Sequence, residues 1–267
     1  MLILLSPAKT LDLDTPTRSV NATQPVFLDE AASLARTAKR LSAPQLQELM
    51  KLSDSLATLN RDRFRAWDLE HSGEQVRPAI QAFRGDVYVG LDAGSFDDAD
   101  LDFAQDHLRI LSGLYGVLKP LDLMRAYRLE MGTRLSTRRG KTLYDFWGDR
   151  VAKSLDAESE AMGSVPIVNL ASNEYFGVVA KPGLSAPVVS PVFRDEKNGE
   201  YKIISFFAKR ARGSLARYLV TERAMSLDAL ADFKGLGYRY SKRESTAETP
   251  VFRRSEKAAR PYLANAA

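Results

Sequence analysis

The chain contains no cysteine among its 267 residues. This absence excludes disulfide bonds, thiolate metal sites and cysteine-ligated iron–sulfur clusters. It fits the reducing environment of the cytoplasm, where we expect the protein, but it also fits a protein that must survive oxidants. A chain of this length can bury a substantial apolar core without disulfide cross-links.

Metal-binding side chains are equally scarce. Only two histidines are present, His71 and His107, so a histidine-rich zinc site is not expected. The acidic run from Asp92 to Asp106 contains no basic residue, but it lacks the required glycine and terminal glutamate of a calcium-binding loop. Ser95 or Asp97 is instead expected to cap a helix that begins here. The sequence therefore predicts no metal and no cofactor.

Long hydrophobic runs are absent as well. The sequence begins MLILLSPAKT, with five apolar residues before Ser6 and no basic residue ahead of them. A signal peptide needs both a basic start and a longer apolar stretch, so we expect these residues to form a buried strand. No later run approaches the length that crosses a bilayer, and no membrane partner is expected.

Positive and negative charges are unevenly distributed along the chain. The formal net charge is +4, yet the residues from Tyr201 onward contain 14 Lys and Arg against 6 Asp and Glu, a net of +8. Residues 1–200 carry the compensating net of −4. A basic last quarter is typical of a surface that binds phosphate or nucleic acid, although many solvated surfaces have a similar composition.

Apolar runs alternate with segments of helical periodicity, which is typical of an α/β protein. The predicted strands and helices of the first two thirds are the strands Met1–Leu5, Asp86–Gly90 and Val165–Leu170 and the helices Leu28–Leu41, Ala43–Trp67, Arg77–Phe83 and Tyr144–Met162. No repeat or low-complexity linker divides the chain. We therefore expect a single α/β domain over residues 1–267, with a mixed central sheet, surrounding helices and a polar tail at 255–267 that frays.

The last third of the chain contains a hairpin signal. The dipeptide Asn198-Gly199, which is favoured in tight antiparallel turns, separates the apolar runs Val188–Arg194 and Tyr201–Phe207. We expect the Tyr201–Phe207 strand to join the mixed central sheet. A second antiparallel pair is predicted at Tyr238–Tyr240 and Val251–Arg253.

The stretch His107–Gly132 allows two interpretations. In the first, a strand ends before a glycine loop at Gly113–Gly116, and a second strand includes Tyr127–Glu130. In the second, the two glycines form the turn of a helix-hairpin-helix, which directs backbone N–H groups toward a nucleic-acid phosphate. The usual hairpin has one apolar residue between its glycines, whereas two separate them here, and Pro120 would fall inside the second helix. The break at Ser53–Ser55 is another candidate for a helix–turn–helix element.

Polar and charged residues gather where the predicted strands end. Strand ends that share an edge of a sheet bring their following loops together, and crevices there are favoured ligand sites. Glu130, Glu174 and Lys9 are the catalytic candidates, because a carboxylate beside cations can act as a general base. The alternative is that these carboxylates form buried ion pairs that tie strand ends together. The complete set expected in one cleft is Ser6, Lys9, Tyr115, Arg128, Glu130, Asn173, Glu174 and Lys209.

Several long sequence blocks span nearly the whole chain. They are MLILLSPAKTLD at Met1–Asp12, HLRILSGLYGVLKPLDLM at His107–Met124, YRLEMG at Tyr127–Gly132, YDFWGD at Tyr144–Asp149, NLASNEYF at Asn169–Phe176, PVFRDEKNGEYKIISFFAKRARG at Pro191–Gly213, and GY at Gly237–Tyr238. With these blocks in this order, the sequence closely resembles the YaaA family of bacterial peroxide-stress proteins, also called DUF328 or UPF0246. The resemblance implies a cytoplasmic protein linked to hydroperoxide resistance through less free iron and less oxidative DNA damage. It also implies DNA binding by a positively charged cleft and a helix-hairpin-helix element in an unusual α/β fold.

Two functions are consistent with the charge pattern and the resemblance. The first is DNA binding in the response to hydroperoxide, which would limit iron-dependent damage, by a protein that we expect to be a monomer on double-stranded or distorted DNA. The alternative is an enzyme that acts on a nucleotide or nucleic-acid base in the strand-end cleft. Direct iron sequestration, a third function, would have only carboxylates as ligands. The backbone contacts to DNA would come from Lys209, Arg210, Arg212 and Arg217, with Arg134, Arg138 and Arg139 as an opposite wall.

Overall fold

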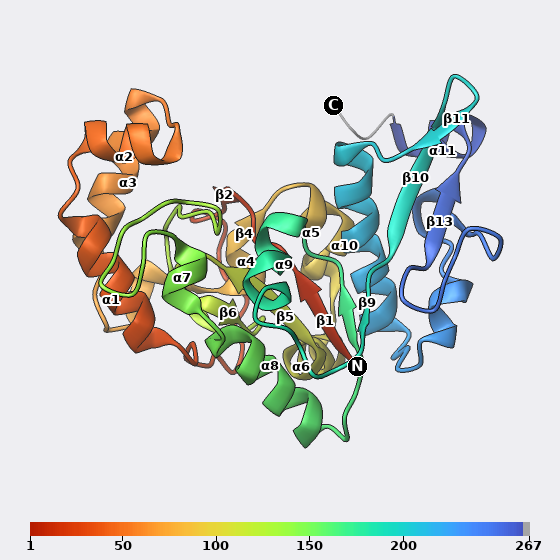
Figure 1. Ribbon diagram of the computed structural model, residues 1–267, viewed down its shortest axis with the longest axis horizontal. Coiled ribbons are helices and arrows are strands. Elements are labelled where there is room, and N and C mark those ends of the chain that lie inside the picture. The colour runs from red at the N-terminus through yellow and green to blue at the C-terminus, as the bar shows by residue number, and fades with distance from the viewer. Residues whose placement is uncertain (264–267) are drawn as a thin grey trace.

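A five-stranded mixed sheet lies at the centre of the molecule (Figure 1). In the computed structural model, which describes residues 1–263, its strand order is β6-β5-β1-β8-β9. β1 is parallel to both β5 and β8, β9 is parallel to β8, and β6 is antiparallel to β5. The predicted α/β fold with a mixed central sheet is confirmed, as are the predicted first strand and the strand before Leu170. The strands are β1 (Leu2–Leu5), β5 (Leu108–Ser112), β6 (Gly116–Leu118), β8 (Ile167–Asn169) and β9 (Val188–Val189).

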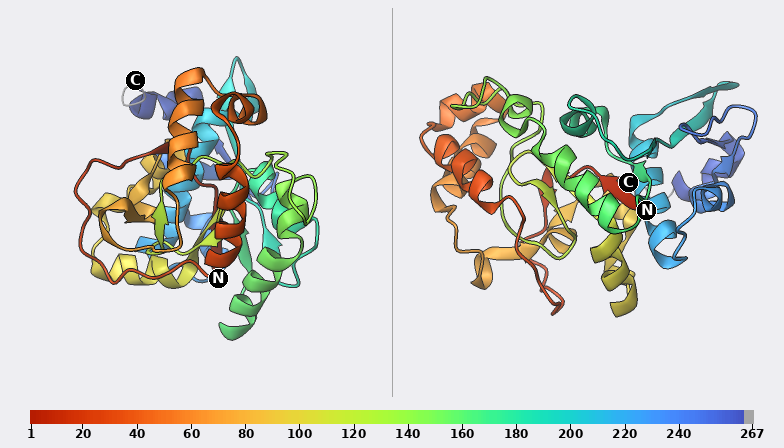
Figure 2. Two further views of the ribbon diagram at one scale, coloured as in Figure 1. Left: turned by 90° about the vertical axis from the view of Figure 1, so that its left-hand side faces the viewer. Right: turned by 60° about the horizontal axis from the view of Figure 1, so that its bottom comes forward.

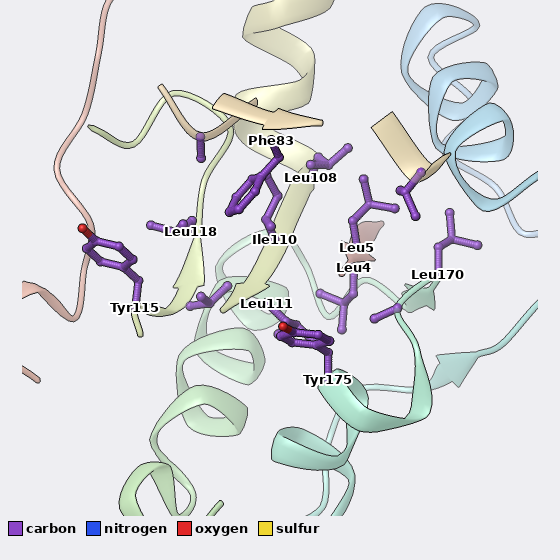
Figure 3. Packing of buried hydrophobic residues seen from close by; sticks show 14 of the residues in the cluster. Leu4, Leu5, Phe83, Leu108, Ile110, Leu111, Tyr115, Leu118, Leu170 and Tyr175 are labelled. Carbon is purple, nitrogen blue, oxygen red and sulfur yellow. The ribbon is translucent and has the colours of Figure 1, made fainter. Parts of the chain in front are cut away.

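The sequence of β1, LILL, explains its place in the middle of this sheet. All four of its residues are buried. A strand that is covered on both faces needs no alternating polar residues, so it reads as a continuous apolar run. Leu4 and Leu5 belong to one cluster of buried side chains with Leu108, Ile110 and Leu170 (Figure 3). The first residues of the chain therefore lie at the centre of the core.

Most of the methionine side chains lie in the same core. Four of the six methionines, Met1, Met50, Met124 and Met131, are at most 9% exposed. A fifth, Met162, is partly buried against the core. Only Met225 has an exposed side chain, at 39%.

Helices pack around the central sheet, and different elements lie at the two ends of the molecule. α1, α2 and α3 group at one end, whereas the strands β10–β13 lie at the other, with the central sheet between them (Figure 1 and Figure 2). Within residues 1–263, no helix is long and apolar enough to cross a membrane. The helices are α1 (Leu28–Lys39), α2 (Ala43–Met50), α3 (Asp54–Ala66), α4 (Ala79–Ala82), α5 (Asp86–Leu91), α6 (Asp98–His107), α7 (Leu143–Trp147), α8 (Arg150–Ala161), α9 (Asn173–Ala180), α10 (Ser205–Thr221) and α11 (Glu256–Leu263).

The C-terminal part of the chain forms a second sheet of four strands in the order β11-β10-β13-β12. The predicted turn is confirmed, because β10 and β11 are antiparallel and Asn198 and Gly199 between them have φ of 56° and 79°. Positive φ at both positions is what a tight turn between twisted strands requires. The run Val188–Arg194, expected to be one strand, is instead divided between β9 of the central sheet and β10 of the second sheet. The second predicted antiparallel pair is confirmed as β12 and β13. The strands are β10 (Val192–Lys197), β11 (Glu200–Lys202), β12 (Arg239–Tyr240) and β13 (Val251–Arg254).

The prediction that Tyr201–Phe207 is a strand of the central sheet is wrong. β11 ends at Lys202 in the second sheet, and α10 begins at Ser205. The guanidinium of Arg210 lies 4.7 Å from the centre of the Phe206 ring. Side chains four residues apart meet in this way on a helix and not on a strand. The two phenylalanines that suggested a strand are therefore part of the first turn of α10.

Two predictions nearer the start of the chain are also wrong. Asp86–Gly90 forms the helix α5 rather than a strand, and only Ala79–Ala82 of the helix predicted at Arg77–Phe83 is helical. The flanking residues join small antiparallel pairs, because pairing with distant segments outweighs local propensity in runs this short. These pairs are β3 (Val76–Pro78) with β7 (Leu123–Arg125) and β2 (Thr10–Leu11) with β4 (Phe83–Arg84).

The loop Gly113–Gly116 joins two strands and not two helices. It connects β5 to the antiparallel β6, so the helix-hairpin-helix interpretation is wrong at this position, and the strand ending at Ser112 is confirmed. The second strand expected at Tyr127–Glu130 is wrong, because β7 ends at Arg125 and residues 127–130 lie in no strand. A tight turn between helices is present elsewhere, between α2 and α3, where the hydroxyl of Ser53 caps α3.

Local signals account for several helix ends. Asp97 caps α6 and accepts a hydrogen bond from the backbone N–H of Asp100, as predicted. The helix predicted at Tyr144–Met162 is divided into α7 and α8 at Gly148, whose φ of 55° is easily adopted by glycine. In the tail at 255–267, residues 256–263 form α11, and residues 264–267 lie outside the described residues.

Helices α5 and α10 pack with their backbones in direct contact. A Cβ atom on Gly213 would lie 1.8 Å from the carbonyl oxygen of Val87, and one on Gly90 would lie 2.1 Å from that of Arg210. Only glycine permits so close an approach. Because α10 also contacts β1 and β10, this crossing fixes the helix that connects the two sheets.

We expect Gly213→Ala to lower the free energy of unfolding by about 3 kcal/mol or more, because the added methyl group must push α5 and α10 apart. Urea denaturation measures the change. The matched control is Gly94→Ala, since a Cβ at Gly94 meets no atom within 4 Å, and its stability should change by less than about 1 kcal/mol. Equal stability of the two variants would contradict the backbone contact.

Candidate functional site

A cleft of about 420 Å³ opens where the parallel strands β1 and β8 end. Its walls come from residues 6–10 after β1, residues 84–88 at the start of α5, the residues that follow β8 into α9, and two side chains of α10. This is the edge of an α/β sheet at which ligands usually bind. We call it the strand-end cleft.

Hydrogen bonds hold the loops of the strand-end cleft together. The hydroxyl of Ser6 accepts a hydrogen bond of 2.8 Å from the backbone N–H of Ser172, and the two hydroxyl oxygens are 3.4 Å apart. The phenol of Tyr88 donates to the carbonyl oxygen of Ser6 at 3.1 Å. Burial raises the pKa of Tyr88, so this phenol stays protonated and remains a donor. Ser6 therefore links β1, α9 and α5.

The carboxylate of Glu130 is held between two cations at the cleft. Its Oε1 lies 3.3 Å from Nζ of Lys9 and 3.1 Å from Nε of Arg128. The side chain of Glu130 is 14% exposed, which is enough for it to line the cleft. Opposite charges this close attract each other, so the two cations hold the carboxylate in place. The ion pairs expected at the strand ends are thus present, and the carboxylate is also open to the cleft.

The second carboxylate, Glu174, is held by the backbone. Its Oε1 accepts a hydrogen bond of 2.9 Å from the N–H of Gly132, and Tyr144 donates to its carbonyl oxygen. Glu174 lines the cleft, whereas its neighbour Asn173 is exposed at the start of α9 and is not among the lining residues. The hydrogen bond therefore connects α9 to the segment that contains Glu130.

The basic residues of α10 are divided between two faces of the helix. Lys209 and Arg212, three residues apart, both line the strand-end cleft. Arg210 instead lies 3.9 Å from the carboxylate of Asp86. Arg217 donates to the carbonyl oxygen of Asp92 at 2.9 Å and to the hydroxyl of Ser95 at 2.6 Å. Arg210 and Arg217 thus anchor α10 to the two ends of α5.

Arg212 has an unusual environment in this cleft. Partial burial lowers the pKa of its guanidinium, which reflects the loss of hydration. Among the residues that the structure describes, neither Arg212 nor Lys209 has a hydrogen-bond or ion-pair partner. The strand-end cleft therefore contains two cations that form no ion pair with a carboxylate of the described residues.

The structure does not place Tyr115 in the strand-end cleft. Tyr115 is fully buried, and its oxygen accepts hydrogen bonds from Nε1 of Trp67 at 3.1 Å and the backbone N–H of Arg125 at 3.0 Å. Nε2 of His71 lies 2.9 Å from the same oxygen. Figure 3 shows Tyr115 well apart from Tyr175, which does line the cleft. A ring held in this way cannot stack on a nucleic-acid base.

Arg138 and Arg139 lie in a separate cavity of about 560 Å³, together with Arg36 of α1 and Arg40, which follows the last residue of α1. We call these four residues and their cavity the arginine pocket. Within the described chain, Arg36, Arg40 and Arg138 have no hydrogen-bond, ion-pair or ring partner. Arg139 lies over the ring of Phe146 at 4.8 Å. Among the residues that the structure describes, no carboxylate lines the pocket.

The arginine pocket differs from the opposite wall expected from the sequence. It lies beside α1, at the end of the molecule away from the second sheet (Figure 1). Arg134 is exposed beside a neighbouring groove with Gln45 and Lys51. The sequence analysis missed Arg36 and Arg40, although their spacing of four residues places them on one face of the predicted helix Leu28–Leu41.

The sequence is similar to a known protein family and to several of its members. Residues 1–244 match a family described as "Peroxide stress protein YaaA". A UPF0246 protein of Shewanella piezotolerans is 52% identical over 256 residues, which cover 96% of this chain and 100% of that protein. A UPF0246 protein of Aliivibrio fischeri is 50% identical over 96% of this chain and 99% of its own length. A further one, of Shewanella pealeana, is 52% identical over 96% of this chain and all of its own.

The buried contact between His71 and Tyr115 predicts a dependence of stability on pH. Burial, and secondarily the charge of Arg125, lowers the pKa of His71. The unfolded chain therefore binds this proton more readily, so the contribution of His71 to stability is complete above about pH 6.5 and is lost as the pH falls below that value. We expect His71→Gln to make the fall in unfolding free energy between pH 7 and pH 5 shallower, by at most about 1.4 kcal/mol per pH unit.

Urea denaturation of both proteins across this pH range tests the expectation. Glutamine keeps a side-chain acceptor for Tyr115 but does not titrate. Because both proteins contain His107, the difference between the two curves measures the titration of His71 alone. Parallel curves would show that His71 is not protonated differently in the folded and unfolded states.

Proposed function

The chain belongs to the peroxide stress protein YaaA family and has a role in the response to oxidative stress, and we propose that it acts there by binding the phosphate backbone of DNA through the arginine pocket. The protein would do so in the cytoplasm, as a monomer on double-stranded or distorted DNA, and would limit iron-dependent DNA damage. The observation that supports this proposal most directly is the group of arginines without partners.

Several arginines elsewhere in the molecule are paired with carboxylates. Arg125 lies 2.7 Å from Asp68, Arg253 lies 2.7 Å from Glu244, and Arg109 pairs with Glu158. In the arginine pocket, by contrast, three guanidinium groups have no partner in the described residues and a fourth is 3.9 Å from Glu30. Unpaired guanidinium groups can bind phosphate through two parallel N–H···O bonds without first breaking an ion pair.

The remaining residues of the pocket suit the same ligand. Hydroxyl groups of Ser33, Thr37, Ser136 and Thr137 line it together with the arginines. Such groups donate to phosphate oxygens and carry no information about the base sequence. Arg134 nearby extends the positive surface along the neighbouring groove. Binding of this kind depends strongly on salt and weakly on sequence, which suits general protection of DNA.

Arg210 and Arg217 are not part of this proposal. Arg210 lies beside Asp86, and Arg217 is bonded to the residues that follow α5. Contact with DNA would require these groups to give up interactions that fix α10. Of the basic residues expected on α10, only Lys209 has an exposed side chain, and it lies in the strand-end cleft rather than beside the arginine pocket.

The triple variant Arg36→Ala, Arg40→Ala, Arg138→Ala should weaken DNA binding similarly for every sequence. It should also flatten the dependence of log affinity on log salt by about 2 to 3 units, because three phosphate contacts are removed. Fluorescence anisotropy with a labelled duplex, between about 50 and 200 mM salt, measures both quantities.

A second triple variant, Lys242→Ala, Arg243→Ala, Lys257→Ala, serves as the control. These three residues are exposed at the other end of the molecule and have no partner in the described residues. The control removes the same amount of positive charge and should leave the salt dependence nearly unchanged. Equal effects of the two triples would mean that only net charge matters, and no effect of the first would remove the arginine pocket from DNA binding.

A further inference from the structure

We propose that the strand-end cleft is a binding site for a small organic phosphate of nucleotide size. Arg212 and Lys209 hold the phosphate, and Glu130 and Glu174 accept hydrogen bonds from hydroxyl or amino groups of the same molecule. This site is distinct from the arginine pocket and does not depend on the proposed binding of DNA.

The position of Arg212 is the first argument. A guanidinium group that loses part of its hydration needs a compensating charge, and the more deeply buried arginines of this protein have one. Arg254, for example, donates to Asp195 at 2.6 Å, and Arg125 to Asp68 at 2.7 Å. Arg212 has no such partner in the described residues although burial lowers its pKa. An anion bound in the cleft would supply the missing charge.

Lys209 makes this wall suitable for phosphate in particular. It lies three residues before Arg212 on the same face of α10, and both side chains line the cleft. The guanidinium can bind two phosphate oxygens side by side, and the ammonium group adds a second positive charge to the same wall. A phosphate monoester carries up to two negative charges near neutral pH, which matches the two cations.

The carboxylates of the cleft indicate which groups the ligand carries besides its phosphate. Oε1 of Glu130 is occupied by Lys9 and Arg128, and Oε1 of Glu174 by the N–H of Gly132. The Oε2 atoms of both receive no hydrogen bond from the described residues, so each can accept one from a ligand. A ligand with hydroxyl or amino groups next to its phosphate can bind both the two cations of α10 and the two carboxylates. Inorganic phosphate can bind only the cations.

The same carboxylates separate this site from the arginine pocket. Asp86, Glu130 and Glu174 line the strand-end cleft, and no carboxylate lines the arginine pocket. A polyanion is repelled by three carboxylates, but a single phosphate group can reach Arg212 and Lys209 while the rest of the ligand donates to Glu130 and Glu174.

Size and shape fit a molecule of this class. The volume of about 420 Å³ is within the range typical of small-molecule sites. Pro7, Val87, Leu170 and Tyr175 give the cleft apolar surface beside its charges, as expected for a site that also contacts a ring. The loops are already fixed by the hydrogen bonds of Ser6, so the site needs little rearrangement to bind.

Isothermal titration calorimetry of the full-length protein tests the proposal with AMP, GMP, CMP and UMP, and with adenosine and inorganic phosphate as partial ligands. We expect at least one nucleoside monophosphate to bind about 10-fold or more tightly than either partial ligand. Only the complete molecule can contact both the two cations of α10 and the two carboxylates. Failure of every monophosphate to bind would overturn the proposal. Displacement of a bound nucleotide by duplex DNA would do the same, because it would assign the cleft to nucleic acid.

Two variants locate the binding. Arg212→Gln should weaken the monophosphate about 30-fold or more, as loss of a charged hydrogen-bonding partner does. Glu130→Gln should weaken the monophosphate relative to inorganic phosphate, because only the monophosphate has groups that donate to Glu130. Arg243→Gln is the matched control, since Arg243 is exposed and remote from the cleft, and it should bind as the unmodified protein does. Equal affinities of the Arg212→Gln and control variants would place the nucleotide elsewhere.

Arg212→Gln also separates this inference from the proposed DNA binding. The variant should retain the salt dependence of DNA binding, because the arginine pocket is untouched. Loss of nucleotide binding with DNA binding retained supports the two-site assignment, and loss of both would show that the two sites are one.

Discussion

The contact between the backbones of α5 and α10 determines much of what surrounds it. Gly90 and Gly213 let the two helices approach until no side chain fits between them. At this distance Arg210 lies beside Asp86 at the start of α5, and Arg217 bonds to Asp92 just beyond its end. The opposite face of α10 then points at the ends of β1 and β8. The division of the α10 cations into anchoring and cleft-lining residues is thus a consequence of helix packing.

Local sequence patterns were sufficient to predict much of the fold and part of the cleft. The apolar run of β1 and the Asn198-Gly199 turn each specify a structure without reference to distant residues. The cleft could be anticipated because residues that follow parallel strands must meet at one edge. For this reason Ser6, Lys9 and Glu174, which follow β1 and β8, line one cavity. Glu130 and Lys209 line the same cavity, but they come from a segment outside any strand and from α10.

The features that could not be predicted depend on distant partners. The segment of α5 has the composition of a strand, and it is helical because Gly90 and Gly213 permit a close crossing with a helix more than a hundred residues later. Tyr115 was expected at the cleft, but Trp67 and His71 from another part of the chain hold it in the core. Similarly, only the folded chain brings Arg36 next to Arg138.

The positions of the methionine side chains determine how a peroxide-stress protein is itself oxidised by peroxide. Without cysteine, the chain cannot form sulfenic or sulfonic acids, and thioether oxidation is the remaining route of damage to sulfur. The four most buried methionines are shielded by the core, whereas Met225 is exposed and lines neither cavity. Peroxide would therefore convert Met225 to its sulfoxide first, at a position outside both cavities.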